Sequence, residues 1–259
     1  MSNNKYFKSI NDKLVVGKSD IKSDEFDVLV FASRDIKTVT IPSNIKRIAS
    51  FAFAPSSIES VSIPSKVRQI CEGSFSKCGK LRLVEIQQDS ELQLIDKRAF
   101  AETSIESIFI PEKVTKIGED AFYSCRKLLK VMIKPNSELR TIEKRAFIHS
   151  SIKSVFVPSQ VTTICECTFA WCFQLIKVEF ASDSKLQMIE KQAFLNSQIE
   201  SIAISSCVSE FDDEWCLGMK NLNNISVVQS KQQNVMRYND QMILGKTDLN
   251  RDDFDALLH

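Results

Sequence analysis

The sequence is poor in the residues from which catalytic and metal sites are most often built. Only two histidines occur among 259 residues, so histidine-based triads and multi-histidine metal sites have little material. No apolar stretch approaches the length of a membrane-spanning helix, and the polar start lacks the apolar segment of a secretory signal. The net charge of +1 argues against a broad electrostatic footprint for nucleic acid or an acidic membrane. Taken as it stands, the sequence predicts a cytoplasmic chain.

Glycine is also scarce where a phosphate loop would need it. Gly17-Lys18-Ser19 and Gly245-Lys246-Thr247 look like the end of such a loop, but Asp12 and Asp240 stand five residues before the Gly-Lys pairs, where glycine is required. Both segments are therefore interpreted as turns. No cluster of polar residues interrupts the pattern described next, so we predict no enzyme, no catalytic residue, no metal and no cofactor.

What the sequence does contain is a regular recurrence of phenylalanine. From Phe53 the steps alternate between 22 and 25 residues, so the true repeating unit is 47 residues. A period in the twenties is typical of a solenoid, whose short turns bury a core only by stacking. We expect the eight rings to form one continuous core. Burying each ring should contribute about 2–3 kcal/mol to the free energy of unfolding. The phenylalanines are Phe31, Phe53, Phe75, Phe100, Phe122, Phe147, Phe169 and Phe194.

A second ladder of apolar residues marks a short strand in each turn. In Val131-Met132-Ile133, for example, the outer two residues share a face. Proline directly follows several of these strands and ends them, as Pro111 does after Ile110. The segment between Ile117 and Leu128 has no proline and predicts a short helix or irregular turn on the opposite side.

Three cysteines share the 47-residue period, namely Cys78, Cys125 and Cys172. With about 4.8 Å between turns they would lie about 10 Å apart, which is too far for a disulfide. The spacing of Cys165-Glu166-Cys167 with Cys172 is not that of a zinc site. We therefore interpret the periodic cysteines as small inward-facing core residues rather than as metal ligands or disulfides.

Charged residues form a further column in which the sign alternates at every turn. A charged docking stripe and an ion ladder that fixes the register of the repeats are both compatible with this pattern, and we favour the ladder. The column comprises Glu72, Lys97, Glu119, Lys144, Glu166, Lys191 and Asp213.

The two ends carry a separate repeat, because residues 10–30 return as residues 238–258. Each copy predicts a β-hairpin that turns at Asn-Asp. We therefore divide the chain into an N-terminal capping module at 1–30, about nine paired repeats at 31–227, and an incomplete second module at 228–259. Either a longer protein has been cut, or the second module serves as a C-terminal cap.

The repeat itself is recognisable in the segment Ile110-Pro111-x-x-Val114-x-x-Ile117-Gly118-x-x-Ala121-Phe122-x-x-Cys125-x-x-Leu128. It resembles the BspA-type, or Treponema-type, leucine-rich repeat, and the paired spacing is similar to that of BspA-like surface antigens of parasitic protists. The resemblance implies an α/β solenoid, a right-handed superhelix with a parallel β-sheet on one face and short helices or turns on the other. It also implies a cell-surface location and attachment to host-cell or matrix proteins, or to another microbial surface protein.

A binding surface is predicted on the outward face of the strands. Phe109, Met132 and Phe156 are the middle residues of successive strands and should face outward, where packing gives no reason for large apolar residues. Glu85 and Glu179 flank them, and Lys130 and Lys177 lie one column over. Alternatively, a loop or a neighbouring molecule covers the rings, or the facing is off by one residue.

These observations favour a non-enzymatic interaction or adhesion module that presents its sheet face to a protein partner. They predict neither nucleic-acid binding nor direct insertion into a membrane. The alternative is an intracellular leucine-rich-repeat scaffold, which the eight cysteines favour if they are reduced thiols.

Overall fold

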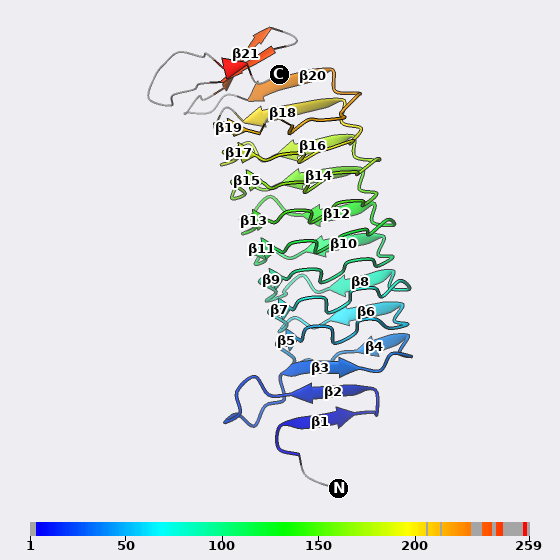
Figure 1. Ribbon diagram of the computed structural model, residues 1–259. Helices are drawn as coiled ribbons and strands as arrows, with labels where there is room; N and C mark the ends of the chain where they lie inside the picture. The colour runs from blue at the N-terminus through cyan, green and yellow to red at the C-terminus, as the bar shows by residue number, and fades with distance from the viewer. Residues whose placement is uncertain are drawn as a thin grey trace.

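The chain coils into a stack of about nine short turns, shown in Figure 1. The computed structural model describes residues 4–205, 207–212 and 214–228, together with the backbone of β21 (Val235–Asn239), β22 (Met242–Gly245) and β23 (Ala256–Leu257). Asp213 of the charged column and most of the predicted module at 228–259 lie outside the described residues.

Two columns of strands run up the stack, side by side in Figure 1. The first has strands of three to five residues, and the second has strands of two residues. The first comprises β4 (Thr38–Thr40), β6 (Ser60–Ile63), β8 (Leu83–Ile86), β10 (Ser107–Ile110), β12 (Lys130–Ile133), β14 (Ser154–Val157), β16 (Lys177–Phe180), β18 (Ser201–Ser205) and β20 (Asn224–Val228). The second comprises β5 (Arg47–Ile48), β7 (Gln69–Ile70), β9 (Leu94–Ile95), β11 (Lys116–Ile117), β13 (Thr141–Ile142), β15 (Thr163–Ile164), β17 (Met188–Ile189) and β19 (Glu210–Phe211).

All strand pairs within these two columns are parallel, so the predicted parallel-sheet solenoid is confirmed. Two features were not predicted. The short strands form a parallel sheet of their own, and the first column is divided between β8 and β10 into a three-stranded sheet and a six-stranded sheet. The six-stranded sheet, β10 to β20, is called the front sheet below.

An antiparallel hairpin extends the second sheet at the N-terminal end. β1 (Phe7–Ile10) pairs with β2 (Leu14–Gly17), and the chain turns at Asn11 and Asp12, whose φ angles are 49° and 50°. The predicted turn at Asn-Asp is confirmed for this copy. β3 (Val28–Ala32) pairs antiparallel with β2 and parallel with β5, so the hairpin covers the strand edge that the first turn would otherwise expose.

A column of stacked phenylalanines fills the core. Seven rings, from Phe53 to Phe194, are fully buried, and neighbouring ring centroids lie 4.6–5.7 Å apart with nearly parallel planes. The prediction of eight was wrong for Phe31, which is 41% exposed beneath the Arg34 guanidinium. In β3 the neighbouring Ala32 faces the core instead. At the far end, the buried Trp215 packs edge-on against Phe194 and closes the column.

The segments that carry these rings are turns, which is one of the two predicted alternatives. No helix occurs among the residues that the structure describes, so the other alternative, short helices, was wrong. Asp120 and Ser124, on either side of Phe122, both have a φ of 55°, which a right-handed helix excludes. The Phe122 N–H donates instead to the carbonyl of Ala146 in the next turn, at 2.8 Å. Hydrogen bonds between turns therefore satisfy the backbone that a helix would satisfy internally.

The periodic cysteines lie in the core, which confirms their interpretation as inward-facing residues. Cys78, Cys125 and Cys172 are fully buried, and none of the eight cysteines, all of which the structure describes, forms a disulfide. The Cys172 thiol donates to the carbonyl of Phe147 at 3.2 Å and lies 3.3 Å from the Ser150 hydroxyl. Burial raises the pKa of the Cys125 thiol to about 11 and that of Cys172 to about 12, so both are neutral at physiological pH.

The alternating charged column forms ion pairs around one member. Glu119 lies 3.0 Å from Lys97 on one neighbouring turn and 3.7 Å from Lys144 on the other, and the hydrogen bond from Lys97 lowers the pKa of its carboxyl. Arg145 adds an ion pair of 2.9 Å to the buried Asp120. Within the described ranges, the other members of the column form no ion pairs with one another. The predicted ladder is therefore confirmed only at Glu119.

Candidate functional site

The outward face of the front sheet carries a row of apolar side chains. In β10, β12 and β14 the residues on either side of the middle position are buried in the core, whereas Phe109, Met132 and Phe156 are half-buried. This alternation places the three middle side chains on the outward face, as β-strand geometry requires.

The strand register brings these side chains into one line. Phe109 lies opposite Met132, and Phe156 lies opposite Glu179. Because Lys130 pairs with Ser154, Met132 stands beside Phe156 in the same row. Because neighbouring strands lie roughly 4.8 Å apart, side chains at these opposed positions form one continuous surface.

The row has a cationic border at Phe109. The Lys134 ammonium lies 5.9 Å from the centroid of the Phe109 ring, within range of a cation–π contact, and forms an ion pair of 2.7 Å with Glu112. Lys134 therefore covers part of this ring, whereas Met132 and Phe156 have no such cover among the contacts of the described chain.

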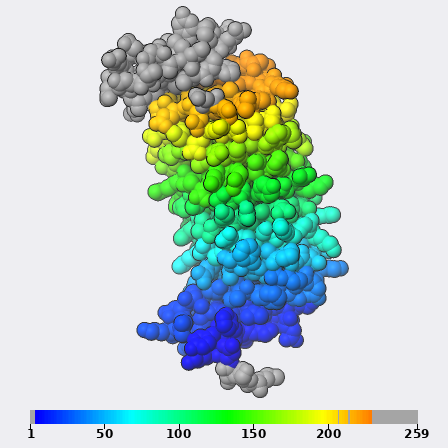
Figure 2. Space-filling model, viewed as in Figure 1, coloured from blue at the N-terminus to red at the C-terminus, as the bar shows by residue number. Residues whose placement is uncertain are grey.

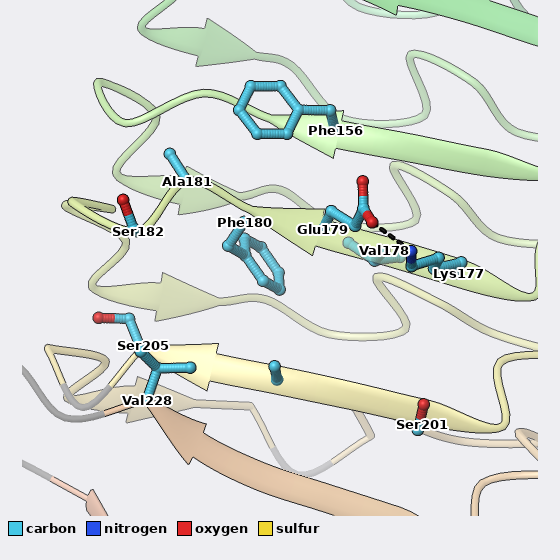
Figure 3. Close-up of a pocket in the computed structure, with 11 residues that line it drawn as sticks. Phe156, Lys177, Val178, Glu179, Phe180, Ala181, Ser182, Ser201, Ser205 and Val228 are labelled. Atoms are coloured by element: carbon cyan, nitrogen blue, oxygen red, sulfur yellow. Dashed lines mark ion pairs between the residues drawn. The ribbon is translucent and has the colours of Figure 1, made fainter. Parts of the chain in front are cut away.

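Beyond Phe156 the row opens into a hollow of about 510 Å³ between β14 and β20, shown in Figure 3. Its apolar lining includes Phe156, Phe180 and Val228, while Lys177 and Glu179 form an ion pair at its border. Short side chains on the neighbouring strand leave the space open, and these are Ser201, Ala203 and Ser205.

Three of the seven predicted residues, Phe156, Lys177 and Glu179, line this hollow. Phe109 and Met132 continue the row, and Lys130 lies exposed at the start of β12. Glu85 is set apart, because β8 belongs to the three-stranded sheet, where Glu85 lines a separate hollow of about 390 Å³.

Sequence reasoning missed much of the lining of the larger hollow. Phe180 occupies the position of Ile133 in the second apolar ladder, 47 residues later, and is expected to face inward with it. In the structure it is half-buried and lines the space. The signal was available, because Phe180 replaces an aliphatic residue at that ladder position. The other missed lining residues are Val178, Ala181, Ser182, Ser201, Ala203, Ser205 and Val228.

The chemistry of the hollow suits binding. Its lining offers apolar surface, hydroxyl groups and one neutralising ion pair, and it contains no histidine or cysteine. Among the described residues, no group of three or more histidine, cysteine or carboxylate side chains is placed to hold a metal ion. The arrangement can accept an apolar side chain and orient polar groups around it.

Comparison with protein families identifies the repeat. The model of the BspA type leucine rich repeat region matches six copies over residues 29–129 and 140–243, well over half of the chain. The chain belongs to the BspA-type leucine-rich repeat family. The resemblance drawn from Ile110 to Leu128 is thereby confirmed.

Solved structures share the fold of this BspA-type repeat protein. A leucine rich cell surface protein from Faecalibacterium prausnitzii A2-165 matches with a TM-score of 0.62 and 20% identity, covering 95% of this chain and 58% of its own. The T. pallidum leucine rich repeat protein TpLRR matches with a TM-score of 0.61 and 22% identity, covering 83% of this chain and 90% of its own. This chain thus spans under two thirds of the Faecalibacterium protein.

No curated protein matches the chain. In the part of the chain that the structure describes, none of the secondary structure is a helix with the length and apolar character needed to cross a membrane.

Proposed function

We propose that this protein is a non-enzymatic interaction module that binds a protein partner through the outward face of the front sheet. One observation carries the proposal: an apolar row of Phe109, Met132 and Phe156 leads into an apolar hollow on a face where packing does not require such residues. Membership of a leucine-rich repeat family, which is typical of protein-interaction surface proteins, supports it.

The geometry also suggests how a partner would be held. An apolar anchor residue fills the hollow beside Phe156, and Met132 extends the contact along the row. The Lys177–Glu179 ion pair stands at the border, where it can fix orientation while adding little affinity. Half-buried aromatic residues at the centre of such a surface usually supply most of the binding energy.

The test is a double substitution, Phe109→Ser with Phe156→Ser. Both side chains face outward, so the fold is expected to persist, as circular dichroism would show. In pull-downs from host-cell and source-cell extracts, specific partners are expected to bind the unaltered protein and to be lost by the variant. Phe7→Ser with Phe31→Ser, two exposed phenylalanines away from the front sheet, is the matched control. Equal retention by both variants would refute a binding role for this face.

Two settings for this function are distinguished by location. Adhesion is supported by the Faecalibacterium neighbour, which is described as a cell surface protein. An intracellular scaffold is supported by eight cysteines that form no disulfide in the described chain, three of them fully buried in the core. Protease treatment of intact source cells separates the two. Loss of the chain from unbroken cells is expected for adhesion, whereas survival until lysis assigns the protein to the scaffold class.

A further inference from the structure

A different surface of the molecule concentrates cations. It is the corner at which each turn enters a strand of the first column, seen along the right-hand side of Figure 1 where β8 to β16 begin. The segments 79–83, 104–107, 126–130, 151–154 and 173–177 form this corner in five consecutive turns and are called the basic rim. It carries seven exposed cations and a single carboxylate, Glu106, although the whole chain has a net charge of only +1. The cations are Lys80, Arg82, Arg126, Lys127, Lys130, Lys153 and Lys177.

Six of these cations have no carboxylate partner. Among the described residues only Lys177 forms an ion pair, with Glu179. The corner that carries the phenylalanine turns is different, since Lys97, Lys144 and Arg145 there all pair with Glu119. The fold therefore neutralises one corner internally and leaves the basic rim uncompensated.

Exposed apolar side chains alternate with the cations along the rim. Leu83, Leu129, Phe173 and Ile176 are between 43% and 58% exposed and come from the three longer turns. In the two shorter turns the strand-entry residues are Ser107 and Ser154, which lie opposite Lys130 and Lys177 of the next turn.

Aromatic rings extend one end of the rim. Trp171, itself partly exposed, packs edge-on against Phe173 with 5.7 Å between ring centroids. On the other side of Trp171, the His149 ring stacks at 6.0 Å. Burial, with a smaller effect of the Arg126 charge, lowers the pKa of His149 and keeps that ring neutral near pH 7.

The strands that the rim precedes are stacked in parallel register within each of the two sheets of the first column. With about 4.8 Å between turns, its five turns extend over roughly 19 Å. The exposed cations and apolar side chains of the rim therefore lie along one corner of the stack.

We propose that the basic rim binds the surface of an anionic lipid bilayer. Cations near such a surface are attracted by its negative potential, and exposed leucine, isoleucine and aromatic side chains partition into the interface between headgroups and acyl chains. A soluble polyanion would use only the cations and leave the four apolar side chains in water. The interleaving of the two kinds of residue therefore favours the bilayer. This contact is peripheral, and the rim adjoins the protein-binding face of the front sheet, with which it shares Lys130 and Lys177.

Co-sedimentation with lipid vesicles tests the proposal. The protein is expected to sediment with vesicles of phosphatidylcholine and phosphatidylserine at about 4:1, and to stay in solution with phosphatidylcholine alone. Raising the salt from about 0.1 M to about 0.5 M should weaken the binding, because the attraction is screened. The triple variant Arg126→Glu, Lys127→Glu, Lys153→Glu should lower the partition coefficient by about ten-fold or more.

A matched triple variant distinguishes the effect of the rim residues from the effect of a lower net charge. Lys113→Glu, Arg140→Glu, Lys185→Glu reverses three exposed cations off the rim that form no ion pair among the described residues, and it should retain most of the binding. Ile176→Ser should weaken binding more than Ile21→Ser, an equally apolar and more exposed residue off the rim.

Three results would overturn the proposal: no sedimentation with the anionic vesicles, equal loss in both triple variants, or retention on immobilised heparin without vesicle binding. The last would assign the rim to a polyanion.

Discussion

At the scale of single residues, the buried thiols form part of a mixed column. A hydroxyl group from the preceding turn lies beside each of these thiols. The Thr103 hydroxyl is 3.3 Å from the Cys125 sulfur, and the Ser150 hydroxyl is 3.3 Å from the Cys172 sulfur. The series stops at Ser197, because Met219 stands where the next cysteine would be. The Ser197 hydroxyl is fully buried and has no hydrogen-bond partner among the residues that the structure describes. A thioether cannot donate and accepts only weakly, which accounts for this unpaired group.

Two serine-to-alanine substitutions test this account. Ser150→Ala removes a partner of the Cys172 thiol and should lower the free energy of unfolding by about 1 kcal/mol. Ser197→Ala removes a buried hydroxyl that is already unsatisfied, so it should be neutral or stabilising. Urea denaturation of both variants measures the difference. A larger loss for Ser197→Ala than for Ser150→Ala would show that Ser197 has a partner in solution.

The periodic cysteines illustrate what could be predicted at this scale. Their 47-residue spacing alone indicated an inward core position for Cys125 and Cys172. The hydroxyl partners were missed because Thr103 and Ser150 lie in the alternate turns, 22 residues earlier, and belong to a different half of the repeat. Only the stacking of one turn on the next brings the two halves together.

At the scale of elements, the strands of the first column were predictable, whereas the short strands of the second column and the conformation of the phenylalanine turns were not. Alternation and proline locate strands such as β10 and β12 because these signals are local. Ala121-Phe122 without proline is equally compatible with a helix. Hydrogen bonds between turns favour the irregular turn over the helix, as when the Phe75 N–H donates to the Ala99 carbonyl at 2.8 Å. The sequence of a single repeat does not reveal such bonds. The left-handed residues at Asp120 and Ser124 follow from that arrangement.

Close contact between turns predicts an unequal pair of glycine substitutions. A Cβ on Gly118 would lie 2.6 Å from the backbone nitrogen of Lys97, whereas a Cβ on Gly79 would meet nothing within 4 Å. Gly118→Ala should therefore cost about 1–3 kcal/mol through overpacking, and Gly79→Ala should change stability by less than about 0.5 kcal/mol. Thermal unfolding of the two variants provides the comparison. Similar melting temperatures would mean that neighbouring turns separate easily at Gly118.

At the scale of the whole molecule, repetition made the architecture predictable, while the surface depends on where repetition fails. The hollow beside Phe156 exists because Ala203 and its serine neighbours are small and Phe180 is turned toward the space. A repeat pattern describes the average turn and cannot show such a local difference in depth. Figure 2 shows the stacked turns as one continuous body. The net charge of +1 likewise concealed the basic rim, since the uncompensated cations lie on one corner of that body and many carboxylates lie elsewhere. A net charge summed over the whole chain does not show that the cations and the carboxylates lie on different parts of the surface.

Register along the stack is the last property that belongs to the whole molecule. A slip by one turn would bring like charges together in the alternating column, and Glu119 is the member that faces cations on both neighbouring turns. Lys144→Ala removes one attraction, worth about 0.2–1 kcal/mol for so exposed a side chain. Lys144→Glu adds a repulsion against Glu119 and should lower the melting temperature further. The same two substitutions at Lys127, which has no ion pair among the described residues, should differ little from each other. If alanine and glutamate at position 144 gave equal melting temperatures, Glu119 would not sense its neighbours and the column would have no part in fixing the register.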